Sequence, residues 1–264
     1  MSVDILTKSL WDARRSFLGW AIGLAGAAGI YTSSYALIEP TSYEEVIDAF
    51  PTEILEAMGW DEIATPTGYL GSTVFGLVVP ILAVIFAIAV GTRFLAGDEE
   101  SGTMELTLTH PVSRTSLVLQ RAGAALLAGL GASVVVSVAV MALAGPVGLD
   151  VPASRIMSAS FSLGLMAVAF AMLAVAIGAW VGRRGIVLGA CSAVAVFAYF
   201  ASTVLTTVDG FEWLDRTSLF YYYGGQDILE DGLSIGNLVV LIVVSVVLVV
   251  VAVIGFQRRD VGTG

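Results

Sequence analysis

Residues 93–114 read RFLAGDEESGTMELTLTHPVSR and separate two long apolar stretches, 67–91 and 118–145. A helix needs about 20 apolar residues to cross the hydrocarbon core of a bilayer, and both neighbours are long enough. The segment between them is rich in charge, with Asp98, Glu99 and Glu100 in succession. We therefore predict that residues 92–117 form a polar connection between two membrane-spanning helices.

The composition of the whole chain is typical of a membrane protein. Of its 264 residues 57% are hydrophobic and 13% are charged, whereas about a quarter of the residues of a soluble domain are charged. The sequence predicts an all-α polytopic protein with a single membrane domain over residues 1–264. Its six predicted transmembrane helices are 17–38, 67–91, 118–145, 156–181, 186–208 and 235–256.

The distribution of basic residues predicts the orientation, because Lys and Arg in short loops favour the cytoplasmic side. With both termini inside the cell, only Arg155 and Arg216 lie outside. The basic residues at the cytoplasmic side or its interface are then Lys8, Arg14, Arg15, Arg93, Arg114, Arg121, Arg183, Arg184, Arg258 and Arg259. We expect a multi-pass protein of the plasma membrane with a cytoplasmic N-terminus.

Three further segments have a predicted place. Residues 1–16 have the pattern of an interfacial helix rather than a cleavable signal peptide, with Ile5, Leu6, Leu10 and Trp11 on one side. Lys8, Arg14 and Arg15 are then available to lipid phosphates. Residues 39–66 form an acidic outer loop with helical spacing of its apolar residues. Residues 209–234 form a second outer loop, whose aromatic residues suit either the membrane interface or an outer exit.

The apolar cores of the predicted helices contain no Asp, Glu, Lys, Arg or His, with Arg121 at the cytoplasmic interface. Ion-coupled pumps need such groups at membrane depth, so a secondary transporter is disfavoured. No catalytic motif is found either, since His110 has no neighbouring metal ligand and there is no H-E-x-x-H helix. The only lysine, Lys8, follows Thr7 and is not part of a P-loop. We predict that the chain is not an enzyme and holds no metal or cofactor of its own.

Small residues recur at helix-packing intervals. Gly19, Gly23 and Ala27 follow one another at every fourth position, and Gly178 and Gly182 repeat this spacing. Such residues allow close contact between helices, either within the chain or in a dimer. Cys191 is the only cysteine and is expected to pack in an apolar helix. The net charge of −10 with a single lysine resembles the composition of proteins from high-salt organisms.

Within the connection, Asp98 suits a helix N-cap, and Glu99 and Glu100 suit the first turn. A short helix is expected to run from there to Pro111, and Ser113 is expected to cap the next helix. Two interpretations stay open from these residues alone. The segment is either a connector that lies at the membrane surface or a docking element for a cytosolic partner.

The segment GDEESGTMELTLTHPVSR resembles the signature of the ABC-2 type transporter permeases: an acidic pair, G-T-x-E, an apolar run and P-V-S-R. The matching residues are Glu99, Glu100, Gly102, Thr103, Glu105, Pro111, Val112, Ser113 and Arg114. Weaker agreement extends to the FQRRDV tail at 256–261, and the layout is similar to the NosY-like branch. His110 departs from the pattern, because relatives carry a small or polar residue there.

The resemblance implies that this chain is one permease subunit, that it pairs with a second permease subunit, and that each docks a cytosolic ATP-binding cassette ATPase, which binds ATP and Mg²⁺. The docking residues implied are Glu99, Glu100, Gly102, Thr103 and Glu105, in a coupling helix between the second and third transmembrane helices. Pro111, Ser113 and Arg114 would form the turn into the third helix. An exporter is the first expectation. The alternative is a non-transporting module that transmits ATPase motion to an extracytoplasmic partner for metal-centre assembly or envelope remodelling. Membrane lipid is an expected partner and nucleic acid is not.

Overall fold

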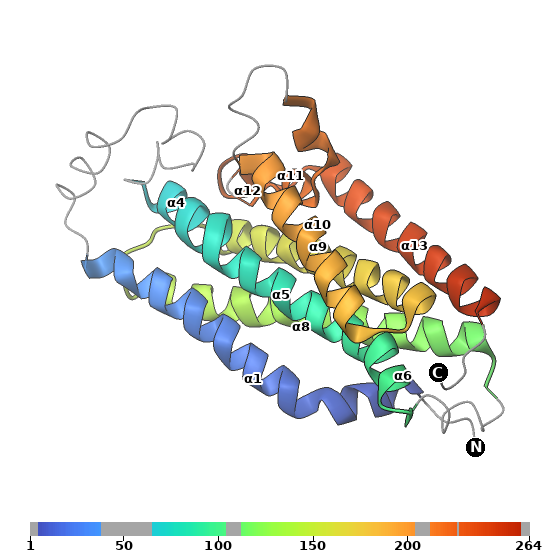
Figure 1. Cartoon of the computed structure of the whole chain (residues 1–264). Helices are drawn as coiled ribbons and strands as arrows, with labels where there is room; N and C mark the ends of the chain where they lie inside the picture. The colour runs from blue at the N-terminus through green and yellow to red at the C-terminus, as the bar shows by residue number, and fades with distance from the viewer. Residues whose placement is uncertain (1–4, 38–64, 104–111, 204–211, 226, 260–264) are drawn as a thin grey trace.

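The computed structural model describes residues 5–37, 65–103, 112–203, 212–225 and 227–259, and all regular secondary structure in these ranges is helical (Figure 1). The long helices are α1 (Ile5–Ser34), α5 (Val79–Thr92), α8 (Arg114–Ala144), α9 (Ala153–Val181), α10 (Arg184–Thr203) and α13 (Ile235–Arg258). The shorter elements are η1 (Tyr35–Leu37), α4 (Pro66–Tyr69), η2 (Leu70–Val78), η3 (Arg93–Gly97), α6 (Asp98–Glu100), η5 (Glu212–Thr217), α11 (Leu219–Tyr223) and α12 (Asp227–Glu230).

Five helices of the described chain are long and apolar enough to cross a membrane. Four of them are α8, α9, α10 and α13, and the fifth is a continuous helix, Pro66–Glu100, built from α4, η2, α5, η3 and α6. The prediction of a polytopic helical protein is therefore confirmed for five spans. The first predicted span, 17–38, is not among them and stays a prediction.

Helix α1 joins the predicted interfacial segment to the predicted first span without interruption. Figure 1 shows that it turns near its N-terminal end. Its buried residues are spaced four apart at both ends: Ile5, Ser9 and Ala13, then Leu24, Ala28 and Thr32. Trp11, which the sequence places on the apolar side, is 64% exposed and lies 3.8 Å beneath the guanidinium of Arg14.

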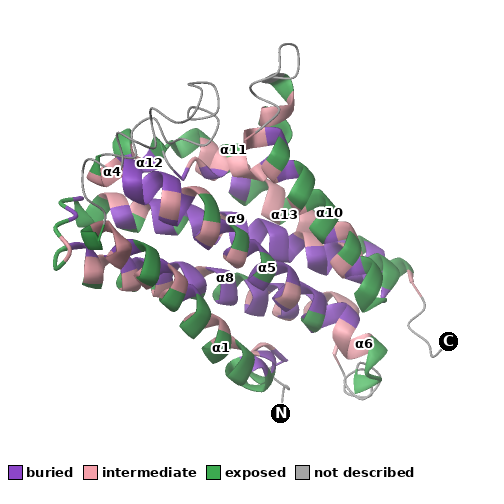
Figure 2. Cartoon of the chain, turned by 60° about the vertical axis from the view of Figure 1, so that its left-hand side comes forward, coloured by how far each residue is buried: buried purple, intermediate pink, exposed green. Residues whose placement is uncertain are grey.

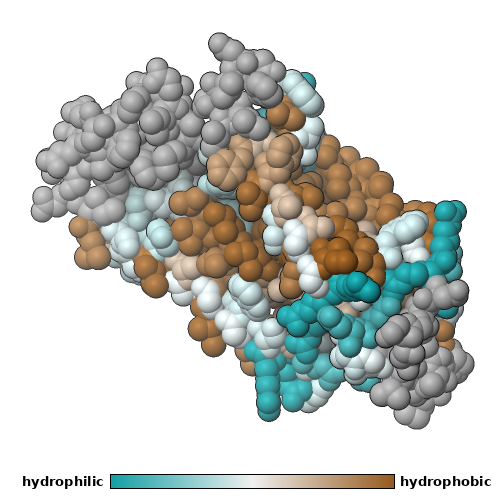
Figure 3. All heavy atoms as spheres, viewed as in Figure 1, coloured by the Kyte–Doolittle hydropathy of each residue, from teal (hydrophilic) through white to brown (hydrophobic). Residues whose placement is uncertain are grey.

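Helix α9 forms the centre of the bundle. It contacts α5, α8, α10 and α13. Of the most hydrophobic 18 residues of α9, 78% are buried inside the protein, compared with 17% for the corresponding stretch of α13. Figure 2 shows the same contrast, with burial concentrated on α9 and α5. Figure 3 shows hydrophobic residues over the middle of the visible face and hydrophilic residues at the end near α6. This distribution is what a helix bundle in a bilayer requires.

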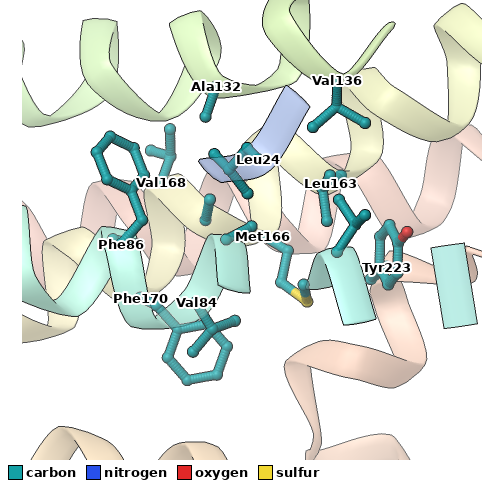
Figure 4. Close-up of a cluster of buried hydrophobic side chains, with 14 of the residues drawn as sticks. Leu24, Val84, Phe86, Ala132, Val136, Leu163, Met166, Val168, Phe170 and Tyr223 are labelled. Carbon is teal, nitrogen blue, oxygen red and sulfur yellow. The ribbon is translucent and has the colours of Figure 1, made fainter. Parts of the chain in front are cut away.

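The hydrophobic core consists of aliphatic and aromatic side chains of α9 and of the helices packed around it (Figure 4). Small residues let the helices approach closely. A Cβ at Gly129 would lie 2.7 Å from the side chain of Val168, and a Cβ at Gly164 would lie 2.7 Å from that of Ser133. A Cβ at Gly178 would lie 3.6 Å from Ala96, which is an ordinary van der Waals distance, so α9 packs against η3 here without requiring a glycine.

The predicted glycine stripe of α1 behaves differently. Cβ atoms at Gly19 and Gly23 would meet nothing within 4 Å among the described residues. These glycines therefore do not bring α1 close to another described helix, and a dimer contact there stays a prediction. Cys191 is buried and free, as expected of a packing residue.

Opposite α6, the short helices α11 and α12 cover the other end of the bundle (Figure 1). The hydroxyl of Tyr223 donates a 2.9 Å hydrogen bond to the carbonyl of Phe75 within the π-helical segment η2, and Ser162 of α9 donates to the carbonyl of Tyr223 at 2.8 Å. These two hydrogen bonds attach the aromatic stretch 219–223 to the bundle. A π-helical segment such as η2 is frequent at functional sites. Most of the predicted outer loop 39–66 lies outside the described residues.

Candidate functional site

The polar connection begins as the continuation of a membrane helix. Asp98 has helical dihedral angles (φ −72°, ψ −30°) and follows η3 without a break. The predicted N-cap at Asp98 is therefore wrong, because the chain keeps its helical hydrogen bonding through this position. The helix ends at Gly102, whose φ of +74° is a left-handed conformation that favours glycine. Its N–H donates to the carbonyl of Glu99 at 3.0 Å.

The residues just beyond the last turn are open to solvent. Glu100, Ser101, Gly102 and Thr103 are all exposed. The hydroxyl of Thr103 donates to the carbonyl of Asp98 at 3.0 Å and so folds the chain back on the helix end. Glu105 and Pro111, and the rest of the predicted coupling helix over 104–111, lie outside the described residues.

Two carboxylates at this end are committed to contacts inside the chain. Asp98 forms an ion pair with Arg121 of α8, and Glu99 forms one with Arg259, which follows α13. The exposed fractions of the four side chains are between 9% and 24%. Because partly buried pairs are less screened by water than surface pairs, they hold their helices together more firmly.

Arg259 also reaches the end of α9. Its Nη1 atom lies 3.5 Å from the carbonyl oxygens of Gly178 and Ala179 in the last turn of that helix. The carbonyls of a final turn lack helical partners and carry partial negative charge, so a cation there is favourable. Gly182 follows with φ +66°, and a Cβ at this position would collide with Arg259 and Glu99.

The third helix starts as predicted. Ser113 is extended (φ −69°, ψ 147°), and its side chain accepts from the N–H of Ser116 at 3.1 Å, which confirms it as the N-cap of α8. Arg114 donates to the carbonyl of Phe256 at 3.2 Å and to that of Arg259. Gln257 donates to the hydroxyl of Thr115 at 2.8 Å. The start of α8 is thus fastened to the end of α13.

Together Asp98, Glu99, Arg114, Arg121 and Arg259 form what we call the polar network, at what we call the polar end of the bundle. Of the predicted docking residues, Glu99 belongs to this network, whereas Glu100, Gly102 and Thr103 lie beside it and are exposed. The distribution of basic residues predicts a cytoplasmic position for Arg121 and Arg259, which stays a prediction, and it predicts no partner for either of them. The sequence feature that could have indicated these pairs is an arginine near the end of an apolar helix, on the same predicted side of the membrane as the acidic residues 98–100.

Within the described residues, no group of three or more His, Cys, Asp or Glu side chains is arranged to hold a metal ion. The contribution that the structure shows for the polar network is charge pairing between helices. The network connects the two flanks of segment 100–113 to four helices, namely Pro66–Glu100, α8, α9 and α13. The connecting side chains are Glu99, Arg114, Arg121 and Arg259.

The family model of the ABC-2 family transporter proteins matches residues 3–261. The chain belongs to the ABC-2 family. This membership covers almost the whole chain and confirms the resemblance of the 98–114 segment at the level of the family, while the NosY-like branch stays a prediction. None of the curated proteins compared with the chain matches it. As an ABC-2 protein it is an integral membrane component of a transport system, and the family implies an ATPase partner.

Proposed function

We propose that this ABC-2 protein is the permease subunit of an ATP-binding cassette exporter and that the polar end is where a separate ATPase drives it. ATP and Mg²⁺ would be bound by that ATPase. A second permease subunit, the same or a different chain, would complete the transporter.

The observation that carries the proposal is the connection between the polar network and the helices. A displacement of segment 100–113 moves the end of helix Pro66–Glu100 and the start of α8 directly. Through the Glu99–Arg259 pair and the Arg114 contacts it also reaches the ends of α9 and α13. Packed interiors transmit such a displacement rather than absorb it. The network is therefore suited to pass motion from the segment into the bundle.

The charge distribution supports a cytoplasmic polar end. Arg93, Arg114, Arg121, Arg184 and Arg259 all lie near this end of the helices, in agreement with the preference of basic residues for the cytoplasmic side. Both ends of the described chain, the start of α1 and the end of α13, are found here as well (Figure 1). We infer that both termini are cytoplasmic.

The proposed docking surface consists of Glu100, Gly102, Thr103 and Glu105, with Glu99 beneath it. Glu100 is an exposed carboxylate that directly follows Glu99 of the network, and it suits a basic residue of the partner. Pro111, Ser113 and Arg114 form the proposed joint into α8. In this joint the Ser113 cap and the Arg114 contacts with the end of α13 resist bending.

Affinity purification of the tagged chain, co-expressed with a candidate ATP-binding cassette ATPase from the same organism, tests the function. We expect the ATPase to co-purify in a fixed ratio and the complex to hydrolyse ATP when it is reconstituted in proteoliposomes. If no ATPase associates with the folded chain, the proposal is wrong.

The non-transporting alternative gives a different result in the same system. An exporter hydrolyses ATP faster when a transported compound is present inside the membrane or on the ATPase side. A mechanical module instead responds to an extracytoplasmic partner protein added to the opposite face, and moves no solute.

A further inference from the structure

A groove of about 490 Å³ opens beside the polar network, between the N-terminal half of α1 and the end of helix Pro66–Glu100. One wall comes from α1, the other from α5, η3 and α6, and Arg184 closes it from α10. It lies near the border between the hydrophilic end and the hydrophobic middle of the molecule, a border that Figure 3 shows close to α6. Of the polar network, Asp98 alone is in the lining of this groove.

Two guanidinium groups line the groove. Arg93 and Arg184 are both exposed. Among the described residues Arg93 donates one hydrogen bond, of 3.0 Å, to the backbone carbonyl of Asp12. A guanidinium has five N–H donors and so can also bind a ligand. Asp98 also lines the groove, but its charge is paired with Arg121. The positive charge of the groove is therefore in excess over the negative.

A cluster of apolar side chains lies beside the arginines, together with Ser16 and Ser101. Phe17 and Trp20 of α1 face Val90 and Phe94 of the neighbouring helix. The rings of Phe17 and Phe94 are 6.4 Å apart in an edge-to-face arrangement, and Trp20 packs on Phe86 at 5.7 Å. Aromatic pairs of this kind hold a wall in place. Phe17, Trp20 and Val90 belong to the predicted membrane spans and Arg93 follows directly after one.

We propose that the groove binds an anionic phospholipid of the leaflet that faces the polar end. Its phosphate would lie between Arg93 and Arg184, and the start of an acyl chain would lie along Phe17, Trp20 and Val90. Arginine forms bidentate hydrogen bonds with phosphate. A soluble phosphate would use the guanidinium groups alone, whereas a lipid would also bury the side chains of Phe17, Trp20 and Val90, so these three residues favour the lipid.

The test is native mass spectrometry of the full-length protein in a neutral detergent, titrated with phosphatidylglycerol or phosphatidylcholine. We expect the first phosphatidylglycerol to bind more tightly than phosphatidylcholine. The double variant R93Q/R184Q should lose about tenfold or more of this affinity, since each basic residue at a membrane surface contributes about 1 kcal/mol to binding of anionic lipid. The matched control is R183Q/R258Q, which removes two exposed arginines outside the groove.

A second variant keeps the charges and fills the space. Ala89 lines the groove and is half-buried, so A89F should also weaken phosphatidylglycerol binding if the acyl chain enters there. Inorganic phosphate at millimolar concentration should not displace the lipid. The proposal is overturned if R93Q/R184Q binds like the wild type, if the control loses as much affinity, if A89F has no effect, or if inorganic phosphate competes fully.

Discussion

Arg259 forms an ion pair with Glu99, 160 residues earlier in the chain, and so joins the end of the last helix to the end of helix Pro66–Glu100. The same guanidinium faces the last carbonyls of α9. Three helix ends therefore meet at one side chain. This contact lies directly behind the exposed residues to which we assign docking, and it explains how a force applied there could reach the bundle.

Replacement of Arg259 by alanine should destabilise the protein. It leaves Glu99 without its partner in a site where the two side chains are only 21% and 19% exposed, and removal of one member of such a pair costs about 1–3 kcal/mol. The midpoint of thermal unfolding in detergent should fall accordingly. Arg258→Ala is the matched control, because Arg258 is an exposed neighbour. Equal midpoints for the two variants would show that the ion pair does not stabilise the fold.

A substitution at Gly182 should be costly for a related reason. Alanine there must adopt φ +66°, and its Cβ would displace the side-chain ends of Arg259 and Glu99, which form the ion pair. Left-handed strain alone costs roughly 1 kcal/mol. At Gly185, inside α10, a Cβ meets open space among the described residues, and alanine should be neutral or stabilise by up to about 1 kcal/mol. Comparison of the unfolding midpoints of G182A and G185A checks both expectations, and a stable G182A would contradict the described geometry.

The opposite end of the molecule depends on Tyr223. Its hydroxyl is buried and donates to the carbonyl of Phe75 at 2.9 Å, so Tyr223→Phe should lower stability by about 1–2 kcal/mol through the loss of a buried hydrogen bond. Tyr221→Phe, at a residue that is 39% exposed, should change little. Hydrogen exchange should increase around η2 in Y223F alone. Unchanged exchange there would mean that the hydrogen bond does not hold the π-helical turn.

Stability should also depend on pH through Asp215. Burial, and then the negative charge of Asp227, raise the pKa of the Asp215 carboxyl, against a smaller opposite effect of Arg216. A pKa raised in the folded state means that the folded protein binds the proton more tightly, so this group adds stability as the pH falls from neutral. The gain is complete below the ordinary pKa of about 4. Asp215→Asn should therefore raise the unfolding midpoint at pH 7 and reduce its rise on acidification.

Asp150→Asn is the control for this experiment, because Asp150 is an exposed carboxylate in the connection between α8 and α9. It should leave the difference between pH 7 and pH 4 unchanged. If D215N and D150N have the same profile, the Asp215 environment described here does not affect stability.

The sequence predicted what depends on neighbours along the chain. Five of the spans follow from apolar length, and the Ser113 cap follows from a hydroxyl ahead of a helix. It predicted the wrong helix start at Asp98, because cap propensity ignores the helix that arrives from Pro66 and passes through that position.

The partners in the candidate site could not be predicted from local pattern. The Asp98–Arg121 and Glu99–Arg259 pairs depend on which helix ends meet at the polar end, and this is decided by packing around α9. The same holds for Gly19 and Gly23, whose spacing suits a helix contact that the described chain does not make. Their outward position follows from how α1 lies on α8, which residue spacing does not specify.

Centrally, we propose that the exposed carboxylate of Glu100 is part of the surface that binds an ATPase. The affinity of the purified chain for its ATP-binding cassette ATPase tests this most directly. Glu100→Arg should weaken this affinity by about tenfold or more, because it places a positive charge opposite a basic partner surface. Asp12→Arg, the same charge change at an exposed residue of α1 at the polar end, should leave the affinity within about twofold of wild type. Equal affinities for wild type and Glu100→Arg, with both proteins folded, would contradict the account.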